Sequence, residues 1–205
     1  MSGETVTSPA AGPEDGRRRG TAARPGGPSA IGDTPVVRLA HPANEGDAEV
    51  WVKMEAANPT GSYKDRMALA MIEAAEADGR LRPGQLVVEY TGGSTGSSLA
   101  FVCAVKGYRL RIVSSDAFAA EKIRTMRAFG AQVELIPSPD GITPGLIPAM
   151  MRRAAEITAQ AGAFATDQFN NTDMVDGYRR LGPGHRVVTI QVDSGLKYLT
   201  GQLYS

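Results

Sequence analysis

The feature that most restricts the fold of this chain is an alternation of short apolar runs with stretches of helical periodicity. Leu86–Val88 is a short apolar run, whereas apolar residues between Met67 and Ala75 recur at helical spacing. The first pattern is typical of a buried strand and the second of a helix with one apolar face. Repeated units of this kind predict an α/β fold, an open and mostly parallel sheet with helices on both faces.

The expected elements follow one another along most of the chain. Strands are predicted at Val50–Glu55, Leu86–Val88, Leu110–Val113, Val133–Ile136, Phe164–Thr166 and Val187–Val192. Helices are predicted from Lys64 to a stop at Asp78-Gly79, over Thr95–Lys106, over Glu121–Phe129, through Ile147–Ala154, and from a cap at Asn170–Asp173 to about Arg180. Ligands of parallel sheets bind at the carboxyl ends of strands, and Tyr90-Thr91-Gly92 is such an end.

Composition excludes several classes of function. Lys+Arg and Asp+Glu number 22 each, so net charge provides no general attraction to nucleic acid or to a membrane surface. The single cysteine, Cys103, excludes an internal disulfide and a multi-cysteine metal site, and it fits a cytoplasmic protein. No apolar run approaches the length of about 18 residues that a membrane helix needs, and no secretory signal is recognisable.

Lys64 is the first candidate for chemistry. It lies in the stretch Asn58-Pro59-Thr60-Gly61-Ser62-Tyr63-Lys64-Asp65-Arg66, where a turn leads into a helix. A lysine is a nucleophile toward aldehydes when its pKa is depressed by burial or by a neighbouring cation, and Arg66 is a candidate for that cation. The alternative is a solvated lysine in the first turn of a helix, which is the commoner fate of a lone lysine.

The turn Thr91-Gly92-Gly93-Ser94-Thr95-Gly96 is the second candidate. It joins a predicted strand to a predicted helix, and its glycines let the backbone approach a ligand closely. The helix N-terminus and three hydroxyl groups then favour a carboxylate or a phosphate. The turn fits neither the P-loop nor the G-x-G-x-x-G spacing. The alternative is a plain helix cap whose glycines serve tight packing.

Taken together, these stretches resemble a known family. Asn58–Arg66 resembles the pyridoxal-phosphate lysine motif of cysteine synthases, and Thr91–Gly96 resembles their substrate-carboxylate loop. Further stretches follow in the family's order, namely Lys106–Leu110, Met126–Ala131 and Asp167–Asn170. The resemblance implies a fold type II pyridoxal-phosphate enzyme, with the fold of the tryptophan synthase β subunit, that acts as a homodimer.

The resemblance also implies residue roles. Lys64 would bind the aldehyde of pyridoxal phosphate and act as acid and base at the substrate's α-carbon. The substrate carboxylate would be held by five residues, Thr91, Gly92, Ser94, Thr95 and Gln168. Typical cysteine synthases have asparagine where this chain has Ser94, and that asparagine also contacts the cofactor. Ser94 is therefore assigned to cofactor and substrate alike, with a shorter reach.

The resemblance predicts a division of the chain into three parts. Residues 1–28 are expected to form a disordered tail, because only Met1 and Val6 are large apolar residues before Ile31. Residues 29–181 resemble the N-terminal part of the family fold. Residues 182–205 resemble its extreme C-terminus, without the glycine-rich loop that cradles the cofactor phosphate in relatives. An internal deletion of much of the cofactor domain is the expectation.

Three functions remain open on the sequence. The leading expectation is formation of L-cysteine from serine or O-acetylserine and sulfide. The second is a truncated remnant without catalytic activity or cofactor, which serves as an interaction protein. The third is an activity like that of a serine/threonine dehydratase or of cystathionine β-synthase. It is suggested by Ser94 and Gly93, which replace residues of the typical cysteine synthase loop.

Overall fold

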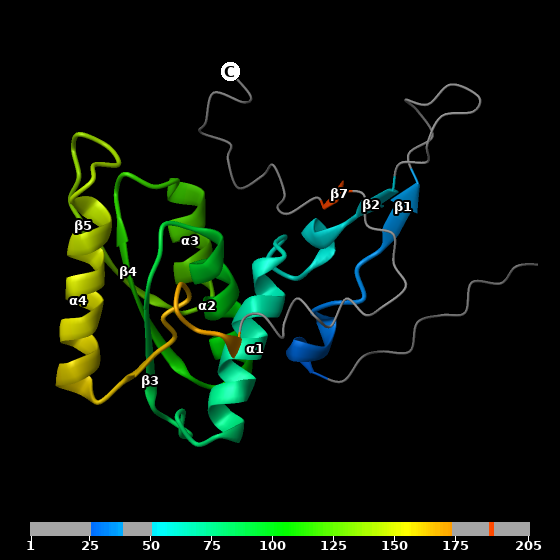
Figure 1. Cartoon of the computed structure of the whole chain (residues 1–205), viewed down its shortest axis with the longest axis horizontal. Helices are drawn as coiled ribbons and strands as arrows, with labels where there is room; N and C mark the ends of the chain where they lie inside the picture. The colour runs from blue at the N-terminus through cyan, green and yellow to red at the C-terminus, as the bar shows by residue number, and fades with distance from the viewer. Residues whose placement is uncertain (1–25, 39–50, 174–188, 191–205) are drawn as a thin grey trace, which may run out of the picture.

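The computed structural model describes residues 26–38, 51–173 and 189–190, and it contains two sheets (Figure 1). The larger sheet has four parallel strands in the order β5-β4-β3-β6. Its strands are β3 (Leu86–Tyr90), β4 (Arg109–Ser115), β5 (Gln132–Ile136) and β6 (Phe164–Ala165). Each predicted strand of this sheet is present, which confirms the parallel α/β fold.

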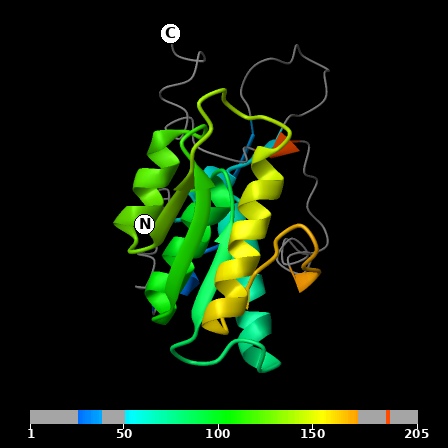
Figure 2. The ribbon, with the colours of Figure 1, turned by 90° about the vertical axis from the view of Figure 1, so that its left-hand side faces the viewer.

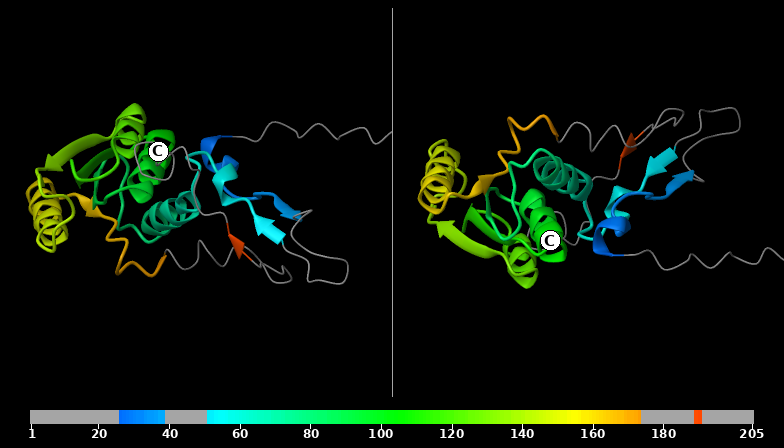
Figure 3. Two further views of the ribbon diagram at one scale, coloured as in Figure 1. Left: turned by 90° about the horizontal axis from the view of Figure 1, so that it is seen from above. Right: turned by 90° about the horizontal axis from the view of Figure 1, so that it is seen from below.

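Four α-helices cover the two faces of this sheet. They are α1 (Lys64–Ala77), α2 (Ser94–Lys106), α3 (Ala120–Ala128) and α4 (Leu146–Ala161). Among the described residues, helix α4 lies alone on one face, whereas α2 and α3 pack on the other and α1 packs beside α2 (Figures 2 and 3). Apolar residues form a core on each face, centred on Ile112 toward α2 and on Val88 toward α4.

The strand register places two loops side by side. Strand β3 pairs with β4 from Leu86 opposite Arg109 to Tyr90 opposite Val113. On its other edge β3 pairs with β6, with Val88 opposite Ala165. Because these strands are parallel, the chain leaves β3 and β6 at the same edge of the sheet. The turn after Tyr90 and the segment after Ala165 therefore meet.

The smaller sheet contains β1 (Val36–Arg38), β2 (Trp51–Lys53) and β7 (Thr189–Ile190). Strands β1 and β2 are antiparallel, and β7 runs parallel to β2. This sheet lies on the far side of α1 from the larger sheet (Figure 1). The 3₁₀ helix η1 (Gly27–Ala30) packs against α2, so close that a Cβ atom at Gly27 would lie 2.6 Å from the Cγ2 atom of Val105.

Two local expectations need correction. The strand predicted over Val50–Glu55 ends at Lys53, and the 3₁₀ helix η2 (Glu55–Ala57) follows because the Glu55 carboxylate turns inward to an ion pair. Helix α1 was predicted to bury one face, yet nearly all of its first nine residues are buried. Neighbours on two sides explain this, since α1 lies between α2 and the smaller sheet (Figure 1).

Some predictions fall on residues outside the described ranges. These are most of the tail 1–28, the helix beyond Asp173, and all of the last strand and of the C-terminal segment 182–205 except Thr189–Ile190. Within the described residues, no helix is long and apolar enough to cross a bilayer. The same part of the chain contains no group of three or more His, Cys, Asp or Glu side chains that could hold a metal ion.

Candidate active site

Lys64 is the first residue of α1, and a short buried network fixes its backbone. The amide of Lys64 donates to the Ser62 hydroxyl at 3.1 Å. The neighbouring Asp65 is fully buried and accepts hydrogen bonds from the backbone amide and the hydroxyl of Thr60. Gly61 has a φ of 73°, a conformation that favours glycine. The motif therefore folds as a tight turn whose side chains hold the helix start in place.

Arg66 forms an ion pair with Glu55 rather than acting on Lys64. Its guanidinium group makes two hydrogen bonds to the Glu55 carboxylate, with Nε 2.8 Å from Oε2 and an η nitrogen 2.9 Å from Oε1. Thr34 and Asn58 donate to the same carboxylate at 2.6 and 2.9 Å. Burial raises the pKa of Glu55, but hydrogen bonds from Arg66 and Thr34 outweigh it and lower the pKa overall. The charge of Arg66 is thus matched by Glu55, contrary to the expectation that it acts on Lys64.

The Lys64 side chain reaches into a cavity. Its Nζ atom lies 4.7 Å from the centroid of the Tyr63 ring and 3.9 Å from the sulfur of Met67. The cavity has a volume of about 430 Å³. Its lining is shared among three parts of the chain: Tyr63 and Lys64, then Tyr90 to Thr95, then Ile147, Met150, Gln168 and Phe169.

The glycine turn also lines this cavity. The amide of Gly93 donates to the Thr91 hydroxyl at 3.2 Å, which closes the turn. A Cβ atom at Gly92 would lie 2.5 Å from the Phe118 ring, and one at Gly96 would lie 2.6 Å from Met126. Close packing therefore excludes side chains at both positions. Helix α2 begins at Ser94, so its N-terminal dipole faces the cavity lining.

Gln168 joins this wall from a distant part of the sequence. The Thr95 hydroxyl donates to the Gln168 side-chain oxygen at 2.7 Å, and the Gln168 side-chain nitrogen lies 3.4 Å from the Tyr90 carbonyl. Before it, Asp167 has a φ of 45°, which turns the chain sharply after β6. The structure thus brings together all six residues predicted for the site: Lys64, Thr91, Gly92, Ser94, Thr95 and Gln168.

Several residues of the site were missed on the sequence. Tyr63, Tyr90 and Phe169 give the cavity aromatic walls, and the rings of Tyr90 and Phe169 lie 6.0 Å apart. Phe169 is 68% exposed, so this side of the cavity opens toward solvent. No periodic pattern marks these positions. The available indication that they belong to the site was their position in the sequence, because each is adjacent to a predicted site residue.

Glu89 is the most unusual missed residue. It directly follows the apolar run Leu86–Val88 within β3 and is 2% exposed. Burial raises its pKa to about 7, although hydrogen bonds from Thr166 and from the amides of Gln168 and Tyr90 oppose that rise. The indication in the sequence was a single glutamate directly after an apolar run. A carboxylate that is buried with such a strand needs hydrogen-bond partners.

The chemistry of the lining fits a carbonyl compound that carries an anion. The cavity is lined by a primary amine, by hydroxyl groups and a carboxamide, and by the N-terminus of a helix. The volume falls within the range of about 300–1,000 Å³ that is typical of small-molecule sites. Pyridoxal phosphate with an amino-acid substrate meets this description, since the aldehyde requires an amine and the amino acid requires a carboxylate site.

Comparisons with known proteins agree with this description. Residues 28–184 match a family described as pyridoxal-phosphate dependent enzyme. A cysteine synthase of Staphylococcus aureus (strain N315) is 41% identical over 141 residues, which cover 69% of this chain and 44% of the relative. Cysteine synthase B of Escherichia coli (strain K12) is 39% identical over 143 residues, which cover 70% of this chain and 46% of the relative.

Solved structures show the same relationship. An O-ureido-L-serine synthase superposes with a TM-score of 0.70 at 37% identity, covering 77% of this chain and 48% of that one. A cysteine synthase from Entamoeba histolytica superposes with a TM-score of 0.66 at 30% identity, covering 84% of this chain and 48% of that one. The chain spans about half the length of the relatives it matches. Since the family match covers most of its residues, the chain belongs to the family of pyridoxal-phosphate dependent enzymes.

Proposed function

We propose that this protein binds pyridoxal phosphate at Lys64 and forms L-cysteine from serine or O-acetylserine and sulfide. The observation that carries the proposal is that Lys64, the Thr91–Thr95 turn and Gln168 line one cavity. The similarity to cysteine synthases supports the choice of reaction. When bound, the cofactor supplies an electron sink that stabilises negative charge at the substrate's α-carbon.

The substrate carboxylate is assigned to the glycine turn. There the hydroxyl group of Thr91 can donate to it, and the dipole of α2 stabilises its charge. The Gln168 carboxamide is held by Thr95 on the same wall and offers a further donor. Together these groups fix the amino acid by its carboxylate end and leave its β-carbon toward the open side of the cavity.

Lys64 is assigned two tasks. Its amine would hold the cofactor's aldehyde, and, once the amino group of the substrate has displaced it there, it would move a proton at the α-carbon of the amino acid. Tyr63 lies against the same amine and Met150 lines the cavity, so apolar groups limit the water around it. Fixing of the helix start by Asp65 and Thr60 keeps this amine in one place relative to the turn.

Absorbance spectroscopy with added pyridoxal phosphate tests the proposal. The wild-type chain is expected to develop a visible band from the lysine-bound cofactor, and Lys64→Ala is expected to lose it while keeping its far-UV circular dichroism. Lys106→Ala is the matched control, because Lys106 lies at the opposite end of α2 and pairs with Glu76. A folded wild-type chain that takes up no cofactor would contradict the proposal and favour an interaction protein without cofactor.

A second candidate is an activity like that of a serine/threonine dehydratase or of cystathionine β-synthase. Ser94 favours it, because this residue lines the cavity where typical cysteine synthases carry asparagine. The similar O-ureido-L-serine synthase also shows that related folds make other serine derivatives. Incubation with serine alone, with sulfide and with homocysteine separates the candidates by product: a keto acid, cysteine or cystathionine.

The homodimer and the division of the chain at residues 181–182 also stay predictions. Light scattering on the purified chain gives the mass in solution and tests the dimer directly. Limited proteolysis followed by mass spectrometry tests the boundary, because a domain that ends near Leu181 is expected to be cut there first.

A further inference from the structure

The Glu89 carboxylate links the end of β3 to the segment that carries Gln168. Its Oε2 atom accepts the Thr166 hydroxyl at 2.6 Å and the backbone amide of Gln168 at 3.1 Å. Its Oε1 atom accepts the amide of Tyr90 at 2.8 Å. Glu89 and Thr166 are 2% and 0% exposed, so water does not compete for these bonds. Three donors therefore converge on one buried carboxylate.

The next bond in this chain of contacts reaches the cavity at Lys64. With its backbone held by Glu89, Gln168 accepts the Thr95 hydroxyl at 2.7 Å through its side chain. Thr95 in turn belongs to the first turn of α2 and lines that cavity. Strand β6 has only two residues, so few ladder bonds hold the segment after it. The carboxylate supplies the attachment that the short strand lacks.

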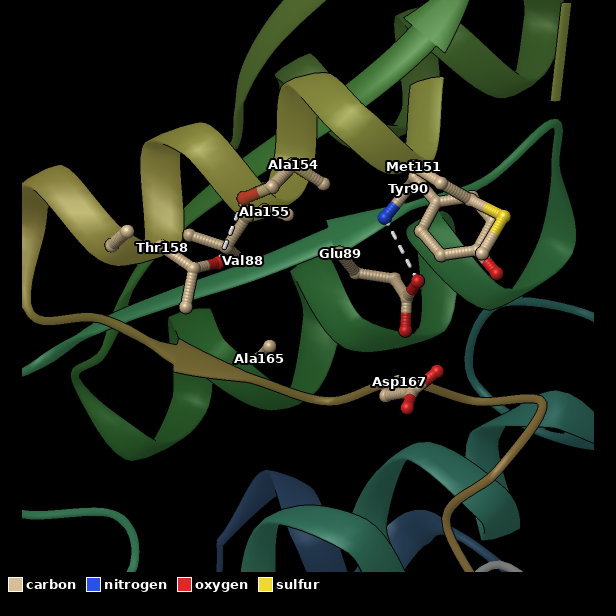
Figure 4. Close-up of a pocket in the computed structure, with 10 residues that line it drawn as sticks. Val88, Glu89, Tyr90, Met151, Ala154, Ala155, Thr158, Ala165 and Asp167 are labelled. Carbon is tan, nitrogen blue, oxygen red and sulfur yellow. Dashed lines mark hydrogen bonds between the residues drawn. The ribbon is translucent and has the colours of Figure 1, made fainter. Parts of the chain in front are cut away.

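Glu89 also lines a second cavity. It has a volume of about 370 Å³ and runs between α4, β3 and β6. Its walls are mostly apolar, with Ala154, Ala155 and Ala165 among them, and its polar end has Glu89 and Asp167 (Figure 4). In Figure 4 the Glu89 side chain points from β3 toward the segment with Asp167. Glu89 thus lines this second cavity while its carboxylate holds the backbone of Gln168, which lines the first.

We propose that Glu89 is a positioning residue that, in its ionised form, holds Gln168 in place for binding the substrate carboxylate. The inference rests on the proposed function, which assigns that carboxylate to the turn and to Gln168. It goes beyond that function because Glu89 does not line the cavity at Lys64 and acts through residues that do, above all Gln168. An ionised carboxylate can accept all three bonds, whereas a protonated one must use an oxygen as a donor.

Protonation of Glu89 should release Gln168. Burial raises the pKa of Glu89 to about 7, and the charge of Asp167, which faces it after β6, contributes to that rise. The group therefore changes its charge near neutral pH, and the hold on Gln168 weakens as the pH falls below about 7. Amino-acid affinity should weaken over the same range, whereas binding of the cofactor at Lys64 should not.

The first experiment needs no cofactor. Nuclear magnetic resonance on the full chain follows the backbone amide of Gln168 as the pH is changed. Its shift is expected to titrate with a midpoint near pH 7 in the wild type and to lose this transition in Glu89→Gln. Thr166→Val removes one donor to the ionised carboxylate and should raise the midpoint. Thr166→Ser keeps a hydroxyl group and should return the midpoint toward the wild-type value.

The second experiment measures binding of L-serine to the chain loaded with pyridoxal phosphate. Glu89→Gln is expected to keep the visible band of the bound cofactor and to bind L-serine about tenfold more weakly. Glu134→Gln is the matched control, because that glutamate lies on β5 and pairs with Arg111 and Arg153, away from Gln168. Its affinity for L-serine should equal that of the wild type.

The outcomes separate the inference from the proposed function. A chain that takes up no cofactor contradicts the proposed function, and the amide titration then decides alone whether Glu89 holds Gln168. A Gln168 amide without a transition near neutral pH overturns the inference. So does a folded Glu89→Gln variant that binds L-serine as tightly as the wild type. If Glu89→Gln does not fold, the Thr166 variants decide instead. A titration midpoint of the Gln168 amide that is the same in the wild type, Thr166→Val and Thr166→Ser overturns the inference.

Discussion

Gly92 shows how strongly the site depends on one residue that has no side chain. The Phe118 ring occupies the space where a Cβ atom at Gly92 would lie, 2.5 Å from its Cε1 atom. Phe118 also packs against the core that contains Tyr90 and Met150. The glycine therefore lets the turn after β3 lie flat against this core. Without that approach, the hydroxyl groups of the turn would move relative to Lys64.

Gly92→Ala should consequently destabilise the fold by about 1–3 kcal/mol, because the ring or the turn must shift to make room. Phe118→Leu in the same chain is expected to recover part of that loss by opening the space. Urea unfolding of the two single variants and the double variant measures the coupling. Gly145→Ala is the control, since nothing lies within 4 Å of a Cβ atom at that position. Equal losses at Gly92 and Gly145 would refute the packing argument.

Glu89 should also give the stability of the fold a particular dependence on pH. Burial raises its pKa from 4.5 to about 7 in the folded state. As the pH rises above 4.5, the unfolded chain loses this proton first, so the free energy of unfolding falls until about pH 7. The loss is of the order of 3 kcal/mol by proton linkage.

Denaturant unfolding between pH 4.5 and 8 checks this expectation. The difference in unfolding free energy between the wild type and Glu89→Gln should change over that interval in favour of the variant. Comparison with the variant removes the contribution of other groups, such as Glu55, whose pKa is lowered and whose effect has the opposite sign. A difference that stays constant with pH would show that Glu89 does not titrate in this range.

At the scale of elements, the start of α1 is the critical junction. The Arg66–Glu55 pair is buried, with side chains 9% and 3% exposed, and it connects α1 to η2 and to Thr34 near β1. A buried charge left without its partner is strongly unfavourable. The pair therefore fixes the direction in which α1 leaves the turn, and with it the position of Lys64.

Arg66→Met should destabilise the protein by about 3–5 kcal/mol, because it leaves the Glu55 carboxylate buried and without its cation. Arg66→Lys should recover little of this loss, since lysine lacks the planar fork that makes two bonds. Thermal or urea unfolding measures both variants. Arg124→Met on α3 is the control, because that side chain is 69% exposed and its loss should change stability by less than about 1 kcal/mol. Comparable losses at Arg66 and Arg124 would contradict this role.

At the scale of the whole molecule, distant parts of the chain meet in the smaller sheet. Residues Thr189–Ile190 pair with Val52–Lys53, more than 130 positions away in the sequence. The larger sheet is assembled from residues 86–165 and does not share a strand with it. The two sheets should therefore respond independently when one of them is disturbed.

Ile190→Pro tests this independence. Proline lacks an amide hydrogen and disrupts strand pairing, so the amides of β2 are expected to exchange with deuterium faster than in the wild type. The amides of β3 and β4 serve as the internal control and should keep their protection. Faster exchange in both sheets would mean that the smaller sheet supports the larger one. Unchanged exchange in β2 would mean that β7 contributes no protection.

The sequence by itself determined the order and type of the elements in the larger sheet, because apolar periodicity reports which side of an element is buried. It also identified six residues that the structure brings to one cavity. Local patterns marked Lys64 and the glycine turn, since turns and helix starts depend on neighbouring residues. Gln168 came from the family resemblance, because its partner Thr95 lies 73 positions away.

Only the tertiary structure decided which partners the buried charged residues have. Arg66 lies two positions from Lys64, yet its charge pairs with Glu55 rather than acting on the lysine. Glu89 directly follows an apolar run, yet it accepts a bond from a segment almost 80 positions away. The physical reason is the same in both cases. Burial makes an unpaired charge unfavourable, and which partner is within reach depends on packing between elements rather than on spacing along the chain.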